Sequence, residues 1–297
     1  SPLGQKLSRT SQEIEIQGRN IRINQSRLAT RYMGKKRTII HCSQSISNWR
    51  EKILKRYQEE EYKWWKHLYS PVVFFGLYRP VDFLSLLLHR GDRIVHWQGS
   101  DILQAGWHYR WLQKIKARHI CETTVEQGIL RLMLQQEVEL VPTFLSNPDD
   151  YKVSYKPTKK PHVFIHVNRR AELESGLYTI ERIAPRCKDV TFHVYGRVEK
   201  PNSFPENIIF HGYVPEAQFN EEIRDYKAGL DLHVFSGFSE VIAKSVLMGQ
   251  YPISCVKYHL VDNAPDEISL IMKLADLPKR NAPNLVARKY YLEKFHA

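Results

Sequence analysis

The sequence lacks the short motifs of several common enzyme classes. Its 297 residues contain no P-loop, no G-x-S-x-G nucleophile elbow and no H-E-x-x-H zinc motif. Its four cysteines lie far apart and form no C-x-x-C pair, at Cys42, Cys121, Cys187 and Cys255. This spacing indicates reduced core thiols rather than a metal site or a disulfide framework, and it favours an intracellular protein.

Long apolar runs are absent as well. No uninterrupted stretch approaches the roughly 20 residues of a membrane span, and no signal peptide opens the sequence. The composition is nevertheless globular, with 42% hydrophobic and 11% aromatic residues. We therefore expect a cytoplasmic protein with a folded core, and a peripheral position at a membrane surface stays open.

Positive charge is concentrated in the first half of the chain. The formal net charge is +12, and residues 1–142 carry 23 Lys and Arg against 13 Asp and Glu, whereas the remainder carries 21 against 19. A basic first half indicates an anionic partner there, such as nucleic acid, an anionic bilayer or a phosphorylated acceptor. A solvated basic surface without a partner would give the same count.

The chain divides into an arm and two series of alternating strand and helix patterns. Residues 1–36 are a polar arm in which residues 13–23 alternate like a hairpin. Residues 37–145 form the first series, residues 146–161 form a linker rich in Pro and charge, and residues 162–297 form the second series. Strands separated by helices predict parallel crossovers, and hence an α/β fold with two Rossmann-like domains.

The expected strands are residues 37–42, 71–78, 92–97, 117–122, 137–142, 162–167, 189–196, 207–212, 231–235 and 251–255. The expected helices are residues 47–67, 81–89, 105–116, 125–135, 176–184, 217–226, 241–247, 266–274 and 284–295. The first of these helices is basic and amphipathic, with Trp49, Ile53 and Trp64 near i+4 spacing. It could lie on an anionic membrane, bind nucleic acid, or have one core face and one solvated face.

Residues 230–255 organise the second series. Their pattern predicts a strand to Phe235, a loop containing Gly237, and a helix that stops at Gly249. Doubly wound sheets bind ligands at the carboxyl ends of strands, against helix N-termini that favour anions. The loop formed by residues 236–240 is therefore the predicted site for a phosphate or a sugar.

The same segment resembles the donor-binding segment of retaining GT-B glycosyltransferases of family 4. That family has a Glu, a Gly-Phe loop and a second Glu before a helix of small residues. Gly237 and Phe238 fit the loop, whereas Ser236 and Lys244 stand at the two acidic positions, with Glu240 between them. The resemblance runs from about residue 37 to the end and implies a GT-B fold, with a cleft between an acceptor domain and a donor domain.

The resemblance also implies a donor site. Arg169 matches an Arg that holds the donor diphosphate, Arg170 is a near alternative, and Ser175 replaces a family Lys. The residues implied for the donor are Arg169, Arg170, Gly212, Tyr213, Ser236, Gly237, Phe238, Ser239, Glu240 and Lys244. A Lys cannot accept hydrogen bonds from ribose hydroxyls, so either the donor differs or donor binding has been lost.

In the first series, the strand end H-W-Q-G-S-D resembles the H-G-[ST]-D sequence of these transferases. The family His there faces the donor sugar, Gln98 is the aligned residue, and His96 shares its side of the strand. The implied catalytic residues are His96, Gln98 and Asp101, and the implied acceptor-binding residues are Trp97, Gly99 and Ser100. Family members use protein cations and helix dipoles on the leaving diphosphate, so no metal or cofactor is expected.

The favoured function is therefore transfer of a sugar from a nucleotide-sugar donor to an anionic acceptor, with retention of configuration. Two other hypotheses stay open. A non-catalytic GT-B scaffold or partner subunit is supported by the departures at Gln98, Ser175, Ser236 and Lys244. A protein that binds or modifies nucleic acid is supported by the basic first half and its tryptophans.

Overall fold

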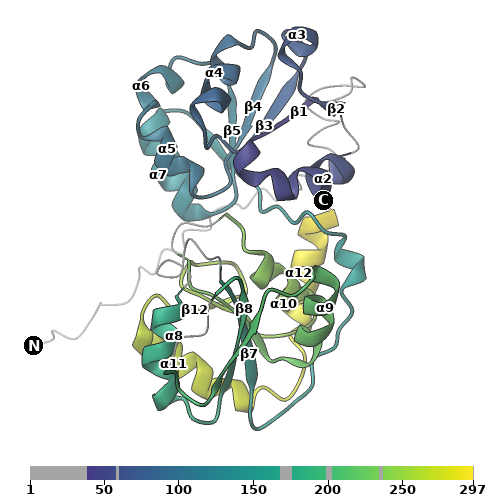
Figure 1. Cartoon of the computed structure of the whole chain (residues 1–297), viewed down its shortest axis with the longest axis vertical. Coiled ribbons are helices and arrows are strands. Elements are labelled where there is room, and N and C mark those ends of the chain that lie inside the picture. The colour runs from purple at the N-terminus through teal and green to yellow at the C-terminus, as the bar shows by residue number, and fades with distance from the viewer. Residues whose placement is uncertain (1–38, 58–59, 168–175, 199–202, 234–236, 297) are drawn as a thin grey trace, which may run out of the picture.

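Two parallel sheets, each covered by helices, lie one above the other in a computed structural model (Figure 1). The structure describes residues 39–57, 60–167, 176–198, 203–233 and 237–296. The predicted hairpin at residues 13–23 lies outside these ranges. All strand pairs within them are parallel, so the predicted α/β fold with two separate sheets is confirmed.

The first sheet has six strands in the order β2-β1-β3-β4-β5-β6. Its strands are β1 (Ile39–Cys42), β2 (Glu60–Glu61), β3 (Val72–Phe75), β4 (Arg93–His96), β5 (Arg118–Cys121) and β6 (Val138–Leu140). Its helices are α2 (Ser47–Tyr57), α3 (Trp64–His67), α4 (Pro80–Leu88), α5 (Asp101–Ala105), α6 (Tyr109–Leu112) and α7 (Thr124–Leu134). Helices on both faces bury the central strands, and β3, with the sequence V-V-F-F, is accordingly apolar throughout.

The second sheet also has six strands, in the order β12-β11-β10-β7-β8-β9. Its strands are β7 (His162–Val167), β8 (Thr191–Gly196), β9 (Ile208–Gly212), β10 (Ala228–Asp231), β11 (Ile253–Ser254) and β12 (Asp262–Asn263). Its helices are α8 (Leu177–Ile183), α9 (Glu216–Glu222), α10 (Glu240–Leu247), α11 (Glu267–Asp276) and α12 (Leu285–His296). The chain runs outward from β7 in both directions, which puts the topological switch point between β7 and β10.

Two apolar layers sandwich this second sheet. One layer joins α8 and α11 to the sheet, with Ile180 and Leu274 fully buried. The other joins α9, α10 and α12, and it also takes in Phe144, which follows β6 of the first sheet. The aromatic side chains of this layer thus connect the two halves of the molecule.

The predicted helix over residues 47–67 is wrong in length. It stops at Tyr57, and Glu60 and Glu61 instead form β2 beside β1. Tyr62 N then donates to Ile40 O over 2.8 Å. The open edge of β1 offers backbone hydrogen bonds to this stretch, so tertiary pairing overrides its helical pattern.

Two other elements also differ from expectation. The strand predicted at residues 231–235 shares only Asp231 with β10, which begins at Ala228. Helix α10 packs tightly on Gly229 of this strand, where an added Cβ would lie 2.7 Å from Val241 Cγ1. A glycine in a strand weakens the sequence signal, although it permits this close packing. The helix predicted over residues 105–116 is shorter, because only α6 (Tyr109–Leu112) and the last residue of α5 fall within that range.

Residues 146–161, predicted as a linker, pack against the second half of the molecule. Tyr151 and Tyr155 are buried, and Ser154 N donates to Met248 O over 3.1 Å. Within the described ranges, no helix combines the length and the apolar character needed to cross a bilayer.

Candidate functional site

The switch point of the second sheet is where a doubly wound sheet binds its ligand. Strands β7 and β10 pair there and end side by side. The loop after β7 carries Arg169, Arg170 and Ser175, which lie outside the described residues, as does Ser236. The described part of the loop after β10 begins at Gly237, and α10 follows from Glu240.

This loop lies against the first half of the molecule. Phe238 N donates to Glu122 Oε2 over 2.7 Å, although 116 positions separate the two residues. A Cβ at Gly237 would come within 2.2 Å of Glu122 Oε2 and 3.4 Å of the Gln98 carbonyl carbon. A side chain at Gly237 would therefore displace the Glu122 carboxylate. The predicted donor loop and the predicted strand end at Gln98 do come together between the two sheets.

Glu122 follows β5 and was not predicted as a site residue. Its side chain is 5% exposed, and burial together with nearby Glu126 raises its pKa well above the ordinary value. Glu122 Oε1 also lies 3.5 Å from His96 Nε2. The sequence signal available was a glutamate directly after an apolar strand, which is too common to single out a site.

His96 is a buried, neutral histidine. Its Nε2 lies 3.2 Å from Thr143 Oγ1, and its ring centroid lies 4.7 Å from that of Phe75. Burial lowers the pKa of His96 to about 3. At neutral pH the imidazole can therefore donate or accept a hydrogen bond but does not carry charge.

Asp101 holds the strand-end loops of the first sheet. The carboxylate is fully buried, with Oδ2 accepting from Leu77 N (3.1 Å) and Oδ1 accepting from Gln98 N (2.9 Å). Burial raises the pKa of Asp101 to about 7. Its contacts are those of a residue that positions Gln98, not of one that touches a substrate.

The neighbours of Gln98 differ in exposure. Trp97 is fully buried, and its Nε1 donates to His119 Nδ1 over 3.3 Å, so its indole belongs to the core. Gly99 adopts a φ of 96°, which a side chain would disfavour, and it makes the turn into α5. Ser100 is exposed at the start of that helix.

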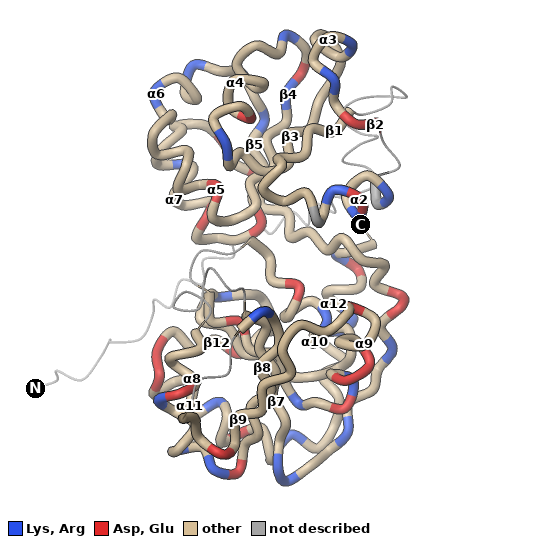
Figure 2. Tube along the Cα trace, in the orientation of Figure 1, with Lys and Arg blue, Asp and Glu red and all other residues tan. Residues whose placement is uncertain are grey.

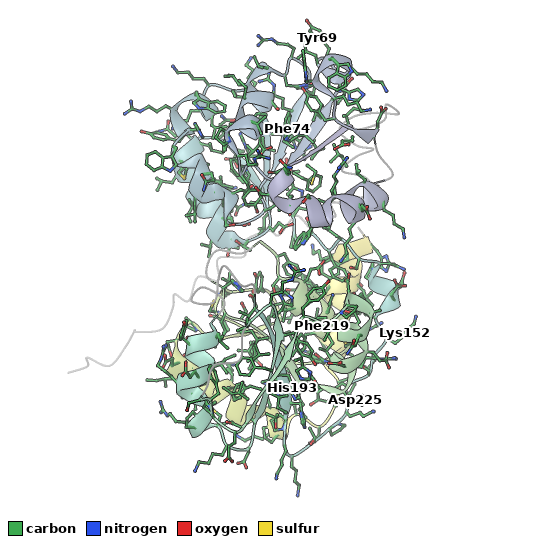
Figure 3. The ribbon with its side chains drawn as sticks, viewed as in Figure 1. Tyr69, Phe74, Lys152, His193, Phe219 and Asp225 are labelled. Atoms are coloured by element: carbon green, nitrogen blue, oxygen red, sulfur yellow. The ribbon has the colours of Figure 1, made fainter. Side chains whose placement is uncertain are left out.

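Lys244 is buried among acidic partners on the second half. Its Nζ lies 3.0 Å from Glu216 Oε1 and 3.6 Å from Glu240 Oε2, and 5.3 Å above the ring of Phe219, which Figure 3 labels. The Lys244 ammonium group is therefore surrounded by glutamates rather than by solvent. Lys244 stands at the position of the second Glu in the resemblance described above.

Glu216 of α9 also pairs with a lysine of α2. Lys52 Nζ lies 2.7 Å from Glu216 Oε2. Burial alone would raise the pKa of Glu216, but Lys52 and Lys244 outweigh it and hold the pKa below its ordinary value. On its other side α2 buries Ile53 in the core. This helix thus has a core face and a cation at the domain boundary.

Gly212 and Tyr213 end β9, and Arg197 follows the adjacent strand β8. Tyr213 is 66% exposed, and the Arg197 guanidinium lies 5.0 Å over its ring. Sequence reasoning missed Arg197, although it directly follows the strand-ending Gly196. Three strand spacings separate β9 from β10, a distance of about 14 Å that suits an extended nucleoside diphosphate.

Other polar groups line the strand ends of the first sheet. Arg79 follows β3, contacts Gln44 Oε1 and was also missed by sequence reasoning. Among the residues that the structure describes, no group of three or more His, Cys, Asp or Glu side chains is placed to hold a metal ion.

The buried acids predict a pH dependence of folding. Burial raises the pKa of Glu126 from 4.5 to about 7. The folded state holds this proton more tightly than the unfolded state, so the stabilisation is complete below about pH 4.5 and is lost as pH rises towards 7. Urea unfolding between pH 5 and pH 8 should show this decline.

Glu126→Gln should flatten that dependence. Glu126 Oε2 accepts from the backbone N–H of Glu122 and of Thr123, at 2.8 Å each, and an amide oxygen can do the same. Equal loss of stability with pH in both proteins would contradict this assignment.

The sequence matches no family model and no curated protein. Solved structures do resemble the fold. HepE of Anabaena, in complex with UDP and glucose, has a TM-score of 0.61 at 11% identity, covering 88% of this chain and 96% of HepE. The UDP-forming α,α-trehalose-phosphate synthase of Burkholderia xenovorans, in complex with glucose-6-phosphate, has a TM-score of 0.57 at 10% identity, covering 76% and 70%.

A third neighbour is larger. TarM of S. aureus, in a complex that contains UDP, has a TM-score of 0.52 at 12% identity, covering 76% of this chain and 52% of TarM. The chain thus spans about half the length of TarM. Together with the two parallel sheets, these neighbours establish that the chain has the GT-B fold of glycosyltransferases.

Proposed function

We propose that the protein transfers a sugar from a nucleotide-sugar donor to an acceptor, with retention of configuration. The observation that carries this proposal is the contact between Phe238 N and Glu122, which joins the strand-end loops of the two sheets. Clefts between domains and the carboxyl ends of doubly wound strands are where such folds bind ligands. Two neighbours with this fold, HepE and TarM, bind UDP.

The second domain supplies the proposed donor site. The diphosphate would lie at the switch point, near Arg169 or Arg170 and the N–H groups at the start of α10, since Ser239 makes no side-chain cap there. The base would lie at Gly212 and Tyr213. Positive charge and helix N–H groups would stabilise the leaving diphosphate, so the proposal includes no metal.

The first domain would hold the acceptor. The Gln98 backbone lies beside Gly237, and His96, two residues earlier on the same strand, is buried and neutral. A neutral imidazole suits hydrogen bonding to a sugar hydroxyl. The proposed acceptor is anionic because the first half of the chain carries most of the positive charge.

Nucleotide binding tests this proposal. We expect a nucleoside diphosphate or one of its sugar conjugates, from a panel of UDP, GDP and ADP forms, to raise the melting temperature. Arg197→Ala should raise the dissociation constant about tenfold, because it removes a cation and its stacking on Tyr213. Arg186→Ala is the matched control, since Arg186 is exposed at the opposite end of β8.

A transferase must also release the nucleotide from its donor. Slow hydrolysis of one nucleotide sugar without acceptor would support catalysis. The absence of any thermal shift and any hydrolysis across the panel would overturn the proposal, whereas equal weakening by both arginine variants would remove only the assignment of Arg197.

A non-catalytic scaffold or partner subunit is the second candidate, and Lys244 favours it. Buried beside Glu216 and Glu240, this lysine offers no acceptor to a ribose. A protein that binds no donor, and in which Lys244 keeps its contacts with Glu216 and Glu240, would fit this role.

A further inference from the structure

Large apolar side chains are exposed together at the end of the first domain that is remote from the second domain. They come from α3, the turn after it, α4, and the turn between α5 and α6 (Figure 1), and Figure 3 labels Tyr69 at this end. We call this surface the outer face, and its six members are 52% to 86% exposed: Trp64, Trp65, Tyr69, Leu84, Leu88 and Trp107. Apolar patches of this kind mark interaction sites.

The three segments of the outer face lie side by side. Arg90 N, just after α4, donates to Leu68 O over 2.9 Å and so joins α4 to the turn after α3. On the other flank, the ring of Phe83 in α4 lies 4.4 Å from that of His108, next to Trp107. The segments that carry the exposed side chains are therefore neighbours on the first domain.

Positive charge surrounds this surface. Residues 63–118 contain nine Lys and Arg against three Asp, and two of the three acids, Asp82 and Asp101, are buried. Lys66 and Arg118 are paired with glutamates. Figure 2 shows Lys and Arg recurring around α3, α4, β4 and α6, with few acidic positions among them.

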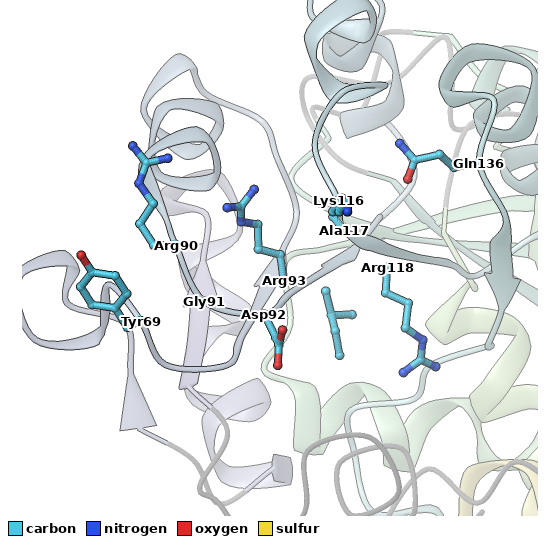
Figure 4. A pocket seen from close by; sticks show the side chains of 10 residues that line it. Tyr69, Arg90, Gly91, Asp92, Arg93, Lys116, Ala117, Arg118 and Gln136 are labelled. Atoms are coloured by element: carbon cyan, nitrogen blue, oxygen red, sulfur yellow. The ribbon is translucent and has the colours of Figure 1, made fainter.

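A basic hollow adjoins the outer face. It has a volume of about 800 Å³ and opens at the amino ends of β4 and β5, opposite to the ends that meet the second domain. Tyr69 lines it together with Arg90, Arg93 and Lys116, and Figure 4 shows the two arginines side by side. Asp92 also lines the hollow, which thus holds four cations against one acid, and an excess of cations suits phosphate groups.

We propose that the outer face docks the protein on an anionic lipid bilayer. The tryptophans and leucines would lie at the boundary between headgroups and acyl chains, with lipid phosphates against Arg90, Arg93 and Lys116. Nucleic acid would use the cations and the tryptophans, but it offers nothing to the aliphatic side chains Leu84 and Leu88. The combination of exposed leucines with phosphate-binding cations therefore favours lipid.

This inference does not depend on the proposed transferase activity. The outer face lies at the opposite end of the first sheet from Gln98 and Glu122. A bound bilayer would thus leave the boundary between the two domains open to solvent.

Flotation of the full chain with lipid vesicles tests the proposal. We expect binding to vesicles that contain phosphatidylglycerol, little binding to pure phosphatidylcholine, and weakening as salt rises. Trp64→Ser combined with Trp107→Ser should reduce binding about tenfold. Arg90→Gln combined with Lys116→Gln should reduce it about fivefold per charge removed.

The matched control is Ile268→Ser combined with Met272→Ser, on α11 of the second domain. These side chains are 69% and 64% exposed, so the control removes comparable apolar surface away from the outer face. It should bind vesicles like the wild type. Unchanged urea midpoints in all variants would show that folding is intact.

Three results would overturn the proposal. One is equal binding to anionic and neutral vesicles, and another is binding that the outer-face variants leave unchanged. The third is a wild-type protein that binds RNA or its own copies through the same tryptophans but not vesicles.

Discussion

Replacing Phe295 by alanine is expected to destabilise the protein by about 3–5 kcal/mol. Phe295 is fully buried in the last turn of α12, where its ring centroid lies 5.0 Å from that of Phe144 and 5.7 Å from that of Phe238. Phe144 follows the first sheet and Phe238 belongs to the predicted donor loop. The cavity would thus open where the two halves of the molecule share one core.

The distribution of tryptophan makes this prediction measurable in each half. All six tryptophans lie in residues 49–111, so tryptophan fluorescence reports on the first domain alone, whereas circular dichroism reports on the whole chain. Urea unfolding of Phe295→Ala should show an earlier midpoint and a separation of the two signals. Leu285→Ala, at an exposed site on the same helix, should change stability by less than about 0.5 kcal/mol.

A loss below about 1 kcal/mol for Phe295→Ala would show that the site collapses around the cavity. Coincident transitions in the variant would show instead that the halves remain coupled without this ring.

Gly196→Ala should strongly destabilise the protein. Gly196 ends β8 with a φ of 119°, and an added Cβ would lie 1.9 Å from Val167 O of the neighbouring strand. Neither the backbone angle nor the strand can adjust without breaking the sheet at the carboxyl end of β7. We expect a loss above about 4 kcal/mol, or failure to accumulate as soluble protein.

Gly128→Ala is the matched control for this substitution. Gly128 lies inside α7, and a Cβ there meets nothing within 4 Å. The same change should therefore stabilise the protein by about 0.5–1 kcal/mol, because alanine favours the helix. Urea midpoints of the two variants should move in opposite directions. A Gly196→Ala protein within about 1 kcal/mol of the wild type would contradict the geometry at β8.

Much of the fold could be predicted because burial on both faces leaves a strong sequence signal. The strand predicted at residues 162–167 is β7 (His162–Val167) without any change of bounds. The errors arise where tertiary contacts decide. Gly229 permits the close approach of α10, but a glycine weakens the strand pattern of β10 in the sequence. Glu60 and Glu61 were predicted to be helical, but they pair with the edge strand β1 instead.

The candidate site was predictable only in part. Resemblance placed Gly237 and Phe238 in a donor loop, and local patterns placed Gln98 at a strand end. Their partner Glu122 could not be found this way, since its contact with Phe238 N spans 116 positions and no local pattern encodes it. The roles of Arg169, Arg170 and Ser236 stay predictions, because these residues lie outside the described part of the chain.

The hydrogen bond between Phe238 N and Glu122 has a consequence for ligand selection under the proposed function. A sugar hydroxyl that accepts a hydrogen bond from the Phe238 N–H would have to displace Glu122 Oε2, because this N–H already has an acceptor. Such an exchange gains little free energy, because the hydrogen bond to Glu122 is lost and the buried Glu122 oxygen is left without this donor. A free monosaccharide would therefore be held weakly, and most of the affinity for an activated sugar would have to come from its nucleotide.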